Sequence, residues 1–322
     1  MAGILVTGAA GFIGAAVVRA LAARGERVIA VDAAPVGRFE VAGSVVAAQC
    51  DLAEWPRLLD LLASEKPAAV IHCAAVVGVV NSVRAPLGTM RVNVEGSLNL
   101  IEAMRIAGIR RLIHMSSEET YGAFEAGTIA EDHPQRPLMA YGISKLAVEQ
   151  LARSYRRLHG IETVNLRTSW VYGPGLPRLR VPRIFLEAAL RGEDCHLAGG
   201  AGLAVDHTYI DDAVAGILGA LDCAAHPFDA YNIGSGEATS LGDMVTIIRE
   251  MVPDARISVG SGPYHHGDVG GVKVPGVAKG ALDVSRAGRV FGYRPRFDIR
   301  LGLAAYFEAL RRDARDRASA TT

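Results

Sequence analysis

The N-terminal segment holds the feature that most restricts the fold, three glycines spaced G-x-x-G-x-x-G between an apolar run and a helical stretch. The run Gly3-Ile-Leu-Val-Thr7 is typical of a buried β-strand, and residues 12–24 have the composition of a helix. Gly8 permits a tight turn, Gly11 lets a ligand approach the backbone, and Gly14 allows the helix to pack closely on the strand. A strand that turns so tightly into a helix predicts the first unit of an α/β sheet.

The same alternation of short β-branched runs and longer helical stretches continues through the first two-thirds of the chain. Further strands are predicted at residues 27–31, 45–48, 69–73, 111–115 and 162–167, and helices at 55–64, 86–107 and 139–159. Buried strands separated by helices form right-handed β-α-β units. The pattern therefore predicts an α/β fold with a Rossmann-type doubly wound parallel sheet.

An acidic residue at the end of the second predicted strand indicates which ligand the glycine turn holds. The helix N-terminus offers backbone amides and a positive dipole end to phosphate groups. Asp32 stands where a carboxylate can bind the adenosine ribose hydroxyls of a dinucleotide and repel a 2′-phosphate. The sequence therefore predicts NAD as the cofactor, with contacts from Gly8, Gly11, Phe12, Ile13, Gly14 and Asp32.

The regular alternation ends after about residue 173. Prolines punctuate the next loop, residues 260–280 are rich in glycine, and helices are predicted at 184–191, 211–221, 241–251 and 301–312. We expect residues 1–172 to form an NAD-binding Rossmann domain to which some later segments return. Residues 173–312 are expected to form mainly a smaller, irregular substrate-binding lobe, and residues 313–322 a frayed tail.

Composition argues against several other classes of protein. The 322 residues include 34 basic and 34 acidic side chains, without a basic stripe, so we expect no nucleic-acid partner. The four cysteines have no paired spacing, which favours reduced thiols and a cytoplasmic protein. Residues 1–18 are uncharged but interrupted by glycines, so no signal peptide or membrane span is expected. His207, His265 and His266 lack ligand spacing, and we expect no metal.

Three further motifs follow the glycine turn in order: Cys50-Asp51-Leu52, His72-Cys73-Ala74-Ala75 and Val92-Asn93-Val94-Glu95-Gly96. With the spacing of the turn, they resemble the extended short-chain dehydrogenase/reductases of the NAD-dependent epimerase/dehydratase family. The resemblance extends over nearly the whole chain. It implies additional cofactor contacts from Asp51, Leu52, Ala74, Ala75 and Asn93.

The segment Tyr141-Gly142-Ile143-Ser144-Lys145 has the spacing Y-x-x-x-K within a predicted helix. Positions i and i+4 share a helix face, so the ammonium can lie beside the phenol and is expected to lower its pKa from about 10. Tyr141 can then accept a proton from a substrate hydroxyl while hydride leaves the same carbon. The resemblance implies that Tyr141 and Lys145 also bind NAD, and that Ser117 bonds the reacting oxygen, with Ser116 as the alternative.

Two adjacent carboxyls follow Ser117 at the carboxyl end of the fifth predicted strand. Glu118 and Glu119 resemble the acidic pair of the sugar-nucleotide 4,6-dehydratases, where one group acts as acid and the other as base in water elimination. In plain 4-epimerases the corresponding residues are small and neutral. The alternative is that both glutamates are solvated loop or helix-capping groups.

Three positions on the substrate side depart from the family pattern. Trp170 stands where sugar-nucleotide enzymes usually carry Asn, and Val205 and His265 stand where they carry diphosphate-binding arginines. The string R-T-S-W-V-Y instead resembles the dTDP-4-dehydrorhamnose reductases. Basic residues that could compensate are Arg178, Arg180, Arg183 and Lys273.

Three functional hypotheses follow. The leading one is an NAD-dependent epimerase/dehydratase acting on a sugar nucleotide or analogue through a keto intermediate. The second is a dehydrogenase or reductase with net hydride transfer on a free sugar, polyol or hydroxy acid, and the third a noncatalytic NAD sensor. The resemblance also implies a homodimer formed through the two long predicted helices, with a small-molecule substrate and no membrane partner.

Overall fold

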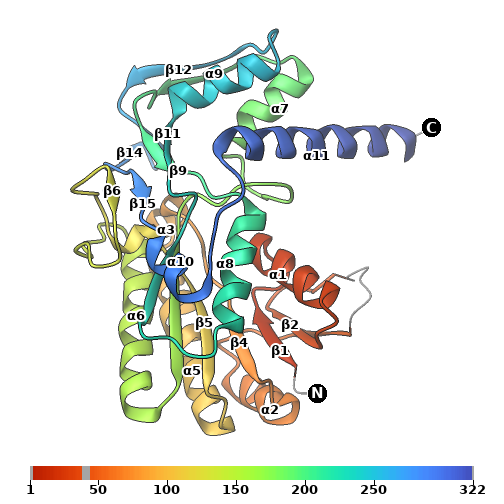
Figure 1. Ribbon diagram of the computed structural model, residues 1–322, viewed down its shortest axis with the longest axis vertical. Coiled ribbons are helices and arrows are strands. Elements are labelled where there is room, and N and C mark those ends of the chain that lie inside the picture. The colour runs from red at the N-terminus through yellow and green to blue at the C-terminus, as the bar shows by residue number, and fades with distance from the viewer. Residues whose placement is uncertain (1–2, 38–43, 321–322) are drawn as a thin grey trace.

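A computed structural model describes residues 3–37 and 44–320 of the chain. Its centre is a seven-stranded sheet with the order β10-β7-β5-β4-β1-β2-β3, in which every neighbouring pair is parallel (Figure 1). The strands are β1 (Ile4–Thr7), β2 (Val28–Asp32), β3 (Val45–Gln49), β4 (Ala69–His72), β5 (Arg111–Ser117), β7 (Glu162–Thr168) and β10 (Ala230–Ile233). The predicted fold class, a doubly wound parallel sheet, is confirmed.

Helices cover both faces of this sheet. Helices α1 and α8 pack together on one side, while α2, α5 and α6 lie on the other (Figure 1). The helices of this part are α1 (Phe12–Ala23), α2 (Trp55–Glu65), α3 (Val79–Arg84), α4 (Pro86–Met90), α5 (Gly96–Ala107), α6 (Ala140–His159), α8 (Ile210–Asp222) and α10 (Ser285–Phe291). Most predicted strands and helices agree with these bounds to within one or two residues.

Two features of the sheet domain differ from the sequence prediction. The single helix expected at 86–107 is divided by a π-helical turn, η1 (Arg91–Glu95), and α3 precedes it. In this turn Asn93 binds the backbone of Val76 with both ends of its amide, an interaction that apolar periodicity does not encode. The strand β10 was not expected, because four residues far downstream of the other strands give little pattern to recognise.

The smaller lobe lies beyond the carboxyl ends of the strands (Figure 1). It contains α7 (Arg183–Arg191), α9 (Leu241–Met251), α11 (Ile299–Ala320), β8 (Cys195–Gly199), β9 (Ala204–Asp206), β11 (Ala238–Ser240), β12 (Ile257–Gly262), β13 (His265–Val269) and β14 (Val272–Pro275). Two short strands, β6 (Thr128–Ile129) and β15 (Ala281–Leu282), pair beside the sheet. The tail expected from residue 313 is instead helical, since α11 continues to Ala320 with exposed side chains at 312–319.

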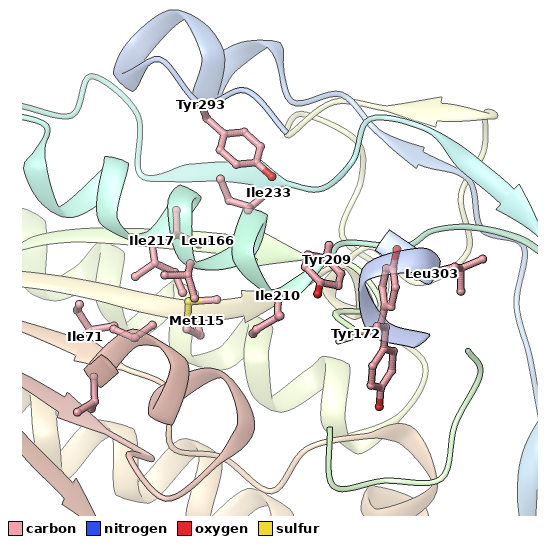
Figure 2. Close-up of a cluster of buried hydrophobic side chains, with 14 of the residues drawn as sticks. Ile71, Met115, Leu166, Tyr172, Tyr209, Ile210, Ile217, Ile233, Tyr293 and Leu303 are labelled. Carbon is pink, nitrogen blue, oxygen red and sulfur yellow. The ribbon is translucent and has the colours of Figure 1, made fainter. Parts of the chain in front are cut away.

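One hydrophobic core joins the sheet to the lobe (Figure 2). It combines side chains from four strands, from α8, from α11 and from the segments that connect such elements, each at most 5% exposed: Ile71, Met115, Leu166, Tyr172, Tyr209, Ile210, Ile217, Ile233, Tyr293 and Leu303. Burying each such side chain stabilises the fold by about 1.5–3 kcal/mol. The lobe is therefore held firmly over the carboxyl ends of the strands.

A buried ion pair lies beneath the end of β5. Arg167 donates two hydrogen bonds to Glu149, at 2.9 and 2.7 Å, and both residues are at most 1% exposed. Arg167 also donates to the Tyr121 hydroxyl at 2.9 Å and to the Glu131 carbonyl at 3.0 Å. Glu149 in turn accepts from the Ser116 hydroxyl at 2.6 Å, which connects the pair to the last residues of β5.

Replacing Arg167 by Met should lower the free energy of unfolding by about 3 kcal/mol, because the buried Glu149 carboxylate would lose its buried counter-ion and keep only the more exposed Arg153, at 3.2 Å. Urea unfolding followed by circular dichroism measures this change. The control is Arg311→Met, which removes only an exposed pair with Glu308 and should change stability by less than about 0.5 kcal/mol. A loss below about 1 kcal/mol for Arg167→Met would contradict the importance of this pair.

Candidate functional site

The glycine turn between β1 and α1 is closed by backbone packing. A Cβ atom at Gly14 would lie 2.0 Å from the carbonyl oxygen of Gly8, and one at Gly8 would lie 2.7 Å from the amide nitrogen of Ala74. Gly8 also has φ +69°, a conformation that L side chains rarely adopt. No side chain caps the N-terminus of α1 at Gly11, so its amides are available to an anionic ligand.

A cavity of about 460 Å³ opens at this turn, and we call it the glycine-turn cavity. Asp32 lies in its wall with its carboxylate oriented by the backbone amides of Ala10 and Ala34, at 3.0 and 2.9 Å. The uncapped helix end and the adjacent carboxylate fit the diphosphate and the adenosine ribose of NAD. The predicted cofactor contacts that line the cavity are Gly8, Gly11, Phe12, Ile13, Gly14, Asp32, Asp51, Leu52, Ala74 and Ala75.

Asn93 lies behind the wall of this cavity and not among the residues that line it. Its side chain accepts from the amide of Val76 at 2.7 Å and donates to the Val76 carbonyl at 3.1 Å and to the Ser144 hydroxyl at 2.9 Å. These bonds hold the loop that follows β4. A direct contact between Asn93 and the cofactor stays a prediction.

A second, smaller cavity of about 130 Å³ adjoins the first, and we call it the Tyr141 cavity. The two share part of their lining: Phe12, Ile13, Cys73, Val77, Leu176 and Arg178. The end of β5, the 3₁₀ turn η2 (Glu118–Thr120) and the first turns of α6 supply its polar wall. This wall unites the predicted reactive residues Ser117, Glu118, Glu119, Tyr141 and Lys145.

The environment of Tyr141 and Lys145 differs from the sequence expectation. Lys145 donates to the carbonyl of Met115 at 2.6 Å, and burial lowers the pKa of Lys145 to about 8. Burial raises the pKa of Tyr141, and a hydrogen bond with Ser117 and the charge of Arg178 oppose that rise. The expected lowering of the Tyr141 pKa by Lys145 is therefore wrong, because desolvation is the larger effect.

The two glutamates of the cavity have different surroundings. Glu118 is 1% exposed, and in the described part of the chain neither of its carboxyl oxygens has a hydrogen-bond partner. Burial raises the pKa of Glu118 to about 7, while the charge of Lys279 opposes the rise. The side chain of Glu119 is 15% exposed, and its amide donates to Ser117 at 3.2 Å. Burial thus favours the protonated form of Glu118.

Sequence reasoning missed Lys279, whose ammonium lies 3.6 Å from Glu118 and 3.5 Å from Glu119. It comes from the glycine-rich segment after β14, far from the motifs of the first half. Its neighbours Ala278 and Gly280 give no pattern that marks a functional lysine. Only the folded chain brings the three groups together.

The substrate-side departures occupy different places. Trp170 lines the Tyr141 cavity with Arg178 and Arg180, whose guanidinium carbon lies 5.4 Å from the Trp170 ring. Val205 is fully buried in β9 and lines neither the glycine-turn cavity nor the Tyr141 cavity. His265 lines a third cavity of about 360 Å³ in the lobe, which we call the lobe cavity.

Of the other basic candidates, Lys273 lines the lobe cavity, whereas Arg183 pairs with Glu187 at 2.6 Å. Aromatic rings connect the lobe cavity with the Tyr141 cavity. Trp170 lies 5.8 Å from Tyr264 and 6.4 Å from His266, measured between ring centroids. A ligand that spans both cavities would therefore pass along these rings.

Within residues 3–37 and 44–320, no group of three or more His, Cys, Asp or Glu side chains is arranged to hold a metal ion. None of the helices in that part of the chain combines the length and the apolar character needed to cross a membrane. The cysteines described, at positions 50, 73, 195 and 223, are all free.

Comparison with known proteins agrees with this site. A UDP-glucose 4-epimerase of Mycolicibacterium smegmatis is 33% identical over 320 residues, which cover 95% of this chain and 98% of the relative. A dTDP-glucose 4,6-dehydratase of Streptomyces antibioticus is 31% identical over 319 residues, covering 94% and 90%. The structure of MoeE5 in complex with UDP-glucuronic acid and NAD superposes with a TM-score of 0.85 at 32% identity, covering 97% of this chain and 99% of MoeE5.

The family model described as the NAD dependent epimerase/dehydratase family matches residues 4–234. This match includes the glycine turn, the end of β5 and the Tyr141–Lys145 pair. The protein therefore belongs to the NAD-dependent epimerase/dehydratase family of extended short-chain dehydrogenase/reductases.

Proposed function

We propose that this protein is a sugar-nucleotide dehydratase, which oxidises a sugar carbon, eliminates water and returns the hydride. The observation that carries the proposal is the carboxyl pair Glu118 and Glu119 in the cavity that also contains Tyr141. An elimination needs a base for a carbon-bound proton and an acid for the leaving hydroxyl. A 4-epimerisation moves a hydride and a hydroxyl proton at C4 alone, so it would not require this pair of carboxyl groups.

In the oxidation, NAD supplies the hydride acceptor when it is bound in the glycine-turn cavity. Tyr141 accepts the proton of the reacting hydroxyl, and Ser117, which is hydrogen-bonded to Tyr141, holds the oxygen. Lys145 lines the same cavity, where it would bind the nicotinamide ribose. These three residues together generate the keto group.

In the elimination, Glu119 removes the proton from the carbon next to the new carbonyl. Glu118 gives its proton to the hydroxyl on the following carbon, the C–O bond breaks, and water leaves. The electrons of the broken C–H bond form a carbon–carbon double bond. Return of the hydride to one carbon and of a proton to the other then saturates this bond and restores the oxidised cofactor.

The lobe cavity is the place we propose for the nucleotide part of the substrate. It has about 360 Å³, and its wall contains the basic or titratable side chains of Lys273 and His265 together with the carboxyl of Asp268 and the phenol of Tyr264. Tyr264 lines the lobe cavity and also contacts Trp170, which lines the Tyr141 cavity. A substrate with its nucleotide in the lobe cavity and its sugar in the Tyr141 cavity would extend along these two rings. Lys273, Arg178 and Arg180 would neutralise the diphosphate in place of the arginines that Val205 and His265 replace.

A second candidate function is net hydride transfer on a smaller substrate, such as a free sugar, polyol or hydroxy acid. The specific observation in its favour is the small volume of the Tyr141 cavity, about 130 Å³, which is bordered by Trp170. A substrate confined to this cavity would need no diphosphate contacts. The first prediction below separates the two candidates.

We further propose that the protein is a cytoplasmic homodimer. Large apolar side chains are exposed on α4, η1 and α6, the region through which the family resemblance implies dimerisation. They are Leu87 at 64%, Val92 at 40%, Ile143 at 43% and Leu158 at 70%. Burial of this surface against a second copy would remove it from water.

A panel of sugar nucleotides offered to the NAD-loaded protein should yield a product lighter by one water without net accumulation of NADH. Tyr141→Phe should reduce turnover at least about 100-fold while NAD binding is retained, because the proton acceptor is lost. Tyr155→Phe is the matched control on the same helix, where the hydroxyl donates to Glu102 at 2.9 Å. Stoichiometric NADH from a free sugar or hydroxy acid would instead support the second candidate.

The elimination step should slow as pH rises above about 7, by about tenfold per pH unit at the limit, because Glu118 loses the proton that it must donate. Glu118→Gln should slow elimination about 100-fold and abolish this dependence. Glu125→Gln, at an exposed carboxyl, is the control. Single-turnover rates from pH 6 to 9 measure the profile, and a rate that is flat over this range would refute the role of Glu118.

Light scattering should give about twice the chain mass of 34.0 kDa. The double substitution Leu87→Glu and Leu158→Glu should shift the mass to that of a single chain, because it puts charges into the buried interface. Leu301→Glu, at a 54% exposed position on α11, should leave the dimer intact. A monomer for the unmodified protein would overturn the dimer.

A further inference from the structure

Lys279 is a buried lysine that lines neither the glycine-turn cavity nor the Tyr141 cavity. Its side chain is 2% exposed, and its ammonium lies 3.6 Å from Glu118 and 3.5 Å from Glu119. An ammonium so far from water is stable only next to negative charge. Among the described residues, these two glutamates are the carboxyl partners within 4 Å.

The backbone around Lys279 is held in place by the segment that follows η2. The amide of Phe124 donates to the carbonyl of Ala278 at 2.9 Å, and the amide of Ala281 donates to the carbonyl of Gly127 at 2.8 Å. A Cβ atom at Gly280 would lie 2.1 Å from the Gly127 carbonyl oxygen, so the two backbone segments are in contact at this point. Strand β15 then continues beside β6 (Figure 1). The lysine is thus anchored at both sides.

The remaining contacts of the ammonium are neutral. It donates to the carbonyl of Gly122 at 3.4 Å and lies 5.2 Å from the centre of the Phe124 ring. The titratable groups that face the glutamates from other elements are the buried carboxyl of Asp206, on the Glu118 side, and three groups on the Glu119 side: the ring of His266, whose pKa burial lowers to about 4, and the phenols of Tyr141 and Tyr264. Two ionised glutamates would therefore place excess negative charge in a site where Asp206 already opposes it.

The nearly equal distances to the two carboxyls determine what Lys279 can do. With Glu119 ionised and Glu118 protonated, the three side chains have no net charge. After Glu119 has taken the carbon-bound proton and Glu118 has released its own to the leaving hydroxyl, the two glutamates have exchanged states. The sum of charges is again zero, and the ammonium still lies next to the ionised carboxylate.

We propose that Lys279 is a positioning residue, the shared counter-ion that lets Glu118 and Glu119 exchange protonation states without creating net charge in the buried site. It acts through the two glutamates and touches neither substrate nor cofactor. This inference rests on the proposed dehydratase function and adds to it the group that makes the acid and base interconvertible. Low local polarity makes such a counter-ion necessary, since water cannot compensate the charge there.

The test compares Lys279→Met, which keeps most of the side-chain volume, with Lys279→Arg, which keeps the charge. In the NAD-loaded protein with a sugar nucleotide that the unmodified enzyme dehydrates, Lys279→Met should slow elimination about 100-fold. The rate of the oxidation half-reaction and the KM should change less than about threefold. Because oxidation then outpaces elimination, NADH should accumulate within the active site. Lys279→Arg should recover at least about tenfold of the lost rate. Lys66→Met, at an exposed lysine, is the control.

The infrared band of protonated carboxyl groups provides a readout that needs no turnover. At pH 6 the unmodified protein should show a band that Glu118→Gln removes. Lys279→Met should add a second protonated carboxyl, which disappears when Glu119→Gln is combined with it. This result is not expected if Lys279 only fills space.

The inference is overturned if the Lys279→Met protein eliminates water at the rate of the unmodified protein, or if its oxidation and elimination rates fall by the same factor. It is also overturned if the carboxyl band of the variant equals that of the unmodified protein. A different result marks the failure of the proposed function. In that case the unmodified enzyme releases no water from any sugar nucleotide, and the role of Lys279 in elimination falls with it. The two failures are thus distinguished by the unmodified protein alone.

Discussion

The carboxyl ends of the parallel strands meet at one edge of the sheet, and this constraint positions the whole candidate site. Right-handed crossovers between parallel strands deliver every strand-to-helix turn to the same side. The glycine turn after β1, the loop after β4, the serine and glutamates after β5 and the Trp170 segment after β7 therefore converge. The shared core of sheet, α8 and α11 then holds the lobe over this edge and encloses the cavities.

Removal of water is the effect that governs the chemistry of the enclosed groups. Burial raises the pKa of Tyr141 and of Glu118 and lowers that of Lys145, in each case the largest cause of the shift. Nearby charges then correct these shifts, and they act strongly because little solvent screens them. The raised pKa of Glu118 results from this order of effects, with Lys279 as the nearby cation.

Much of the fold could be predicted because its signals are local. The strands of the sheet appear in the sequence as short apolar runs. The turn after β1 needs glycine at positions 8 and 14 because a Cβ atom there would clash with backbone, and the glycine spacing in the sequence already indicates this turn. Predictions failed where a distant contact decided the local structure. The π turn at Asn93 is such a case, because it depends on the backbone of Val76. Residues 313–320 failed for another reason, since they continue the helix α11 although their low apolar content gives no sign of burial.

For the site, sequence spacing and strand order predict most of the residues that line the glycine-turn and Tyr141 cavities: the glycine turn with Asp32, the i and i+4 pair Tyr141 and Lys145, and the glutamates after Ser117. The pKa shifts of Glu118, Tyr141 and Lys145, and the cation next to the glutamates, depend on the folded chain. Desolvation depends on how distant segments pack over the site. Lys279 contacts Glu119 although the two residues are 160 positions apart in the chain, and no local sequence pattern predicts such a contact.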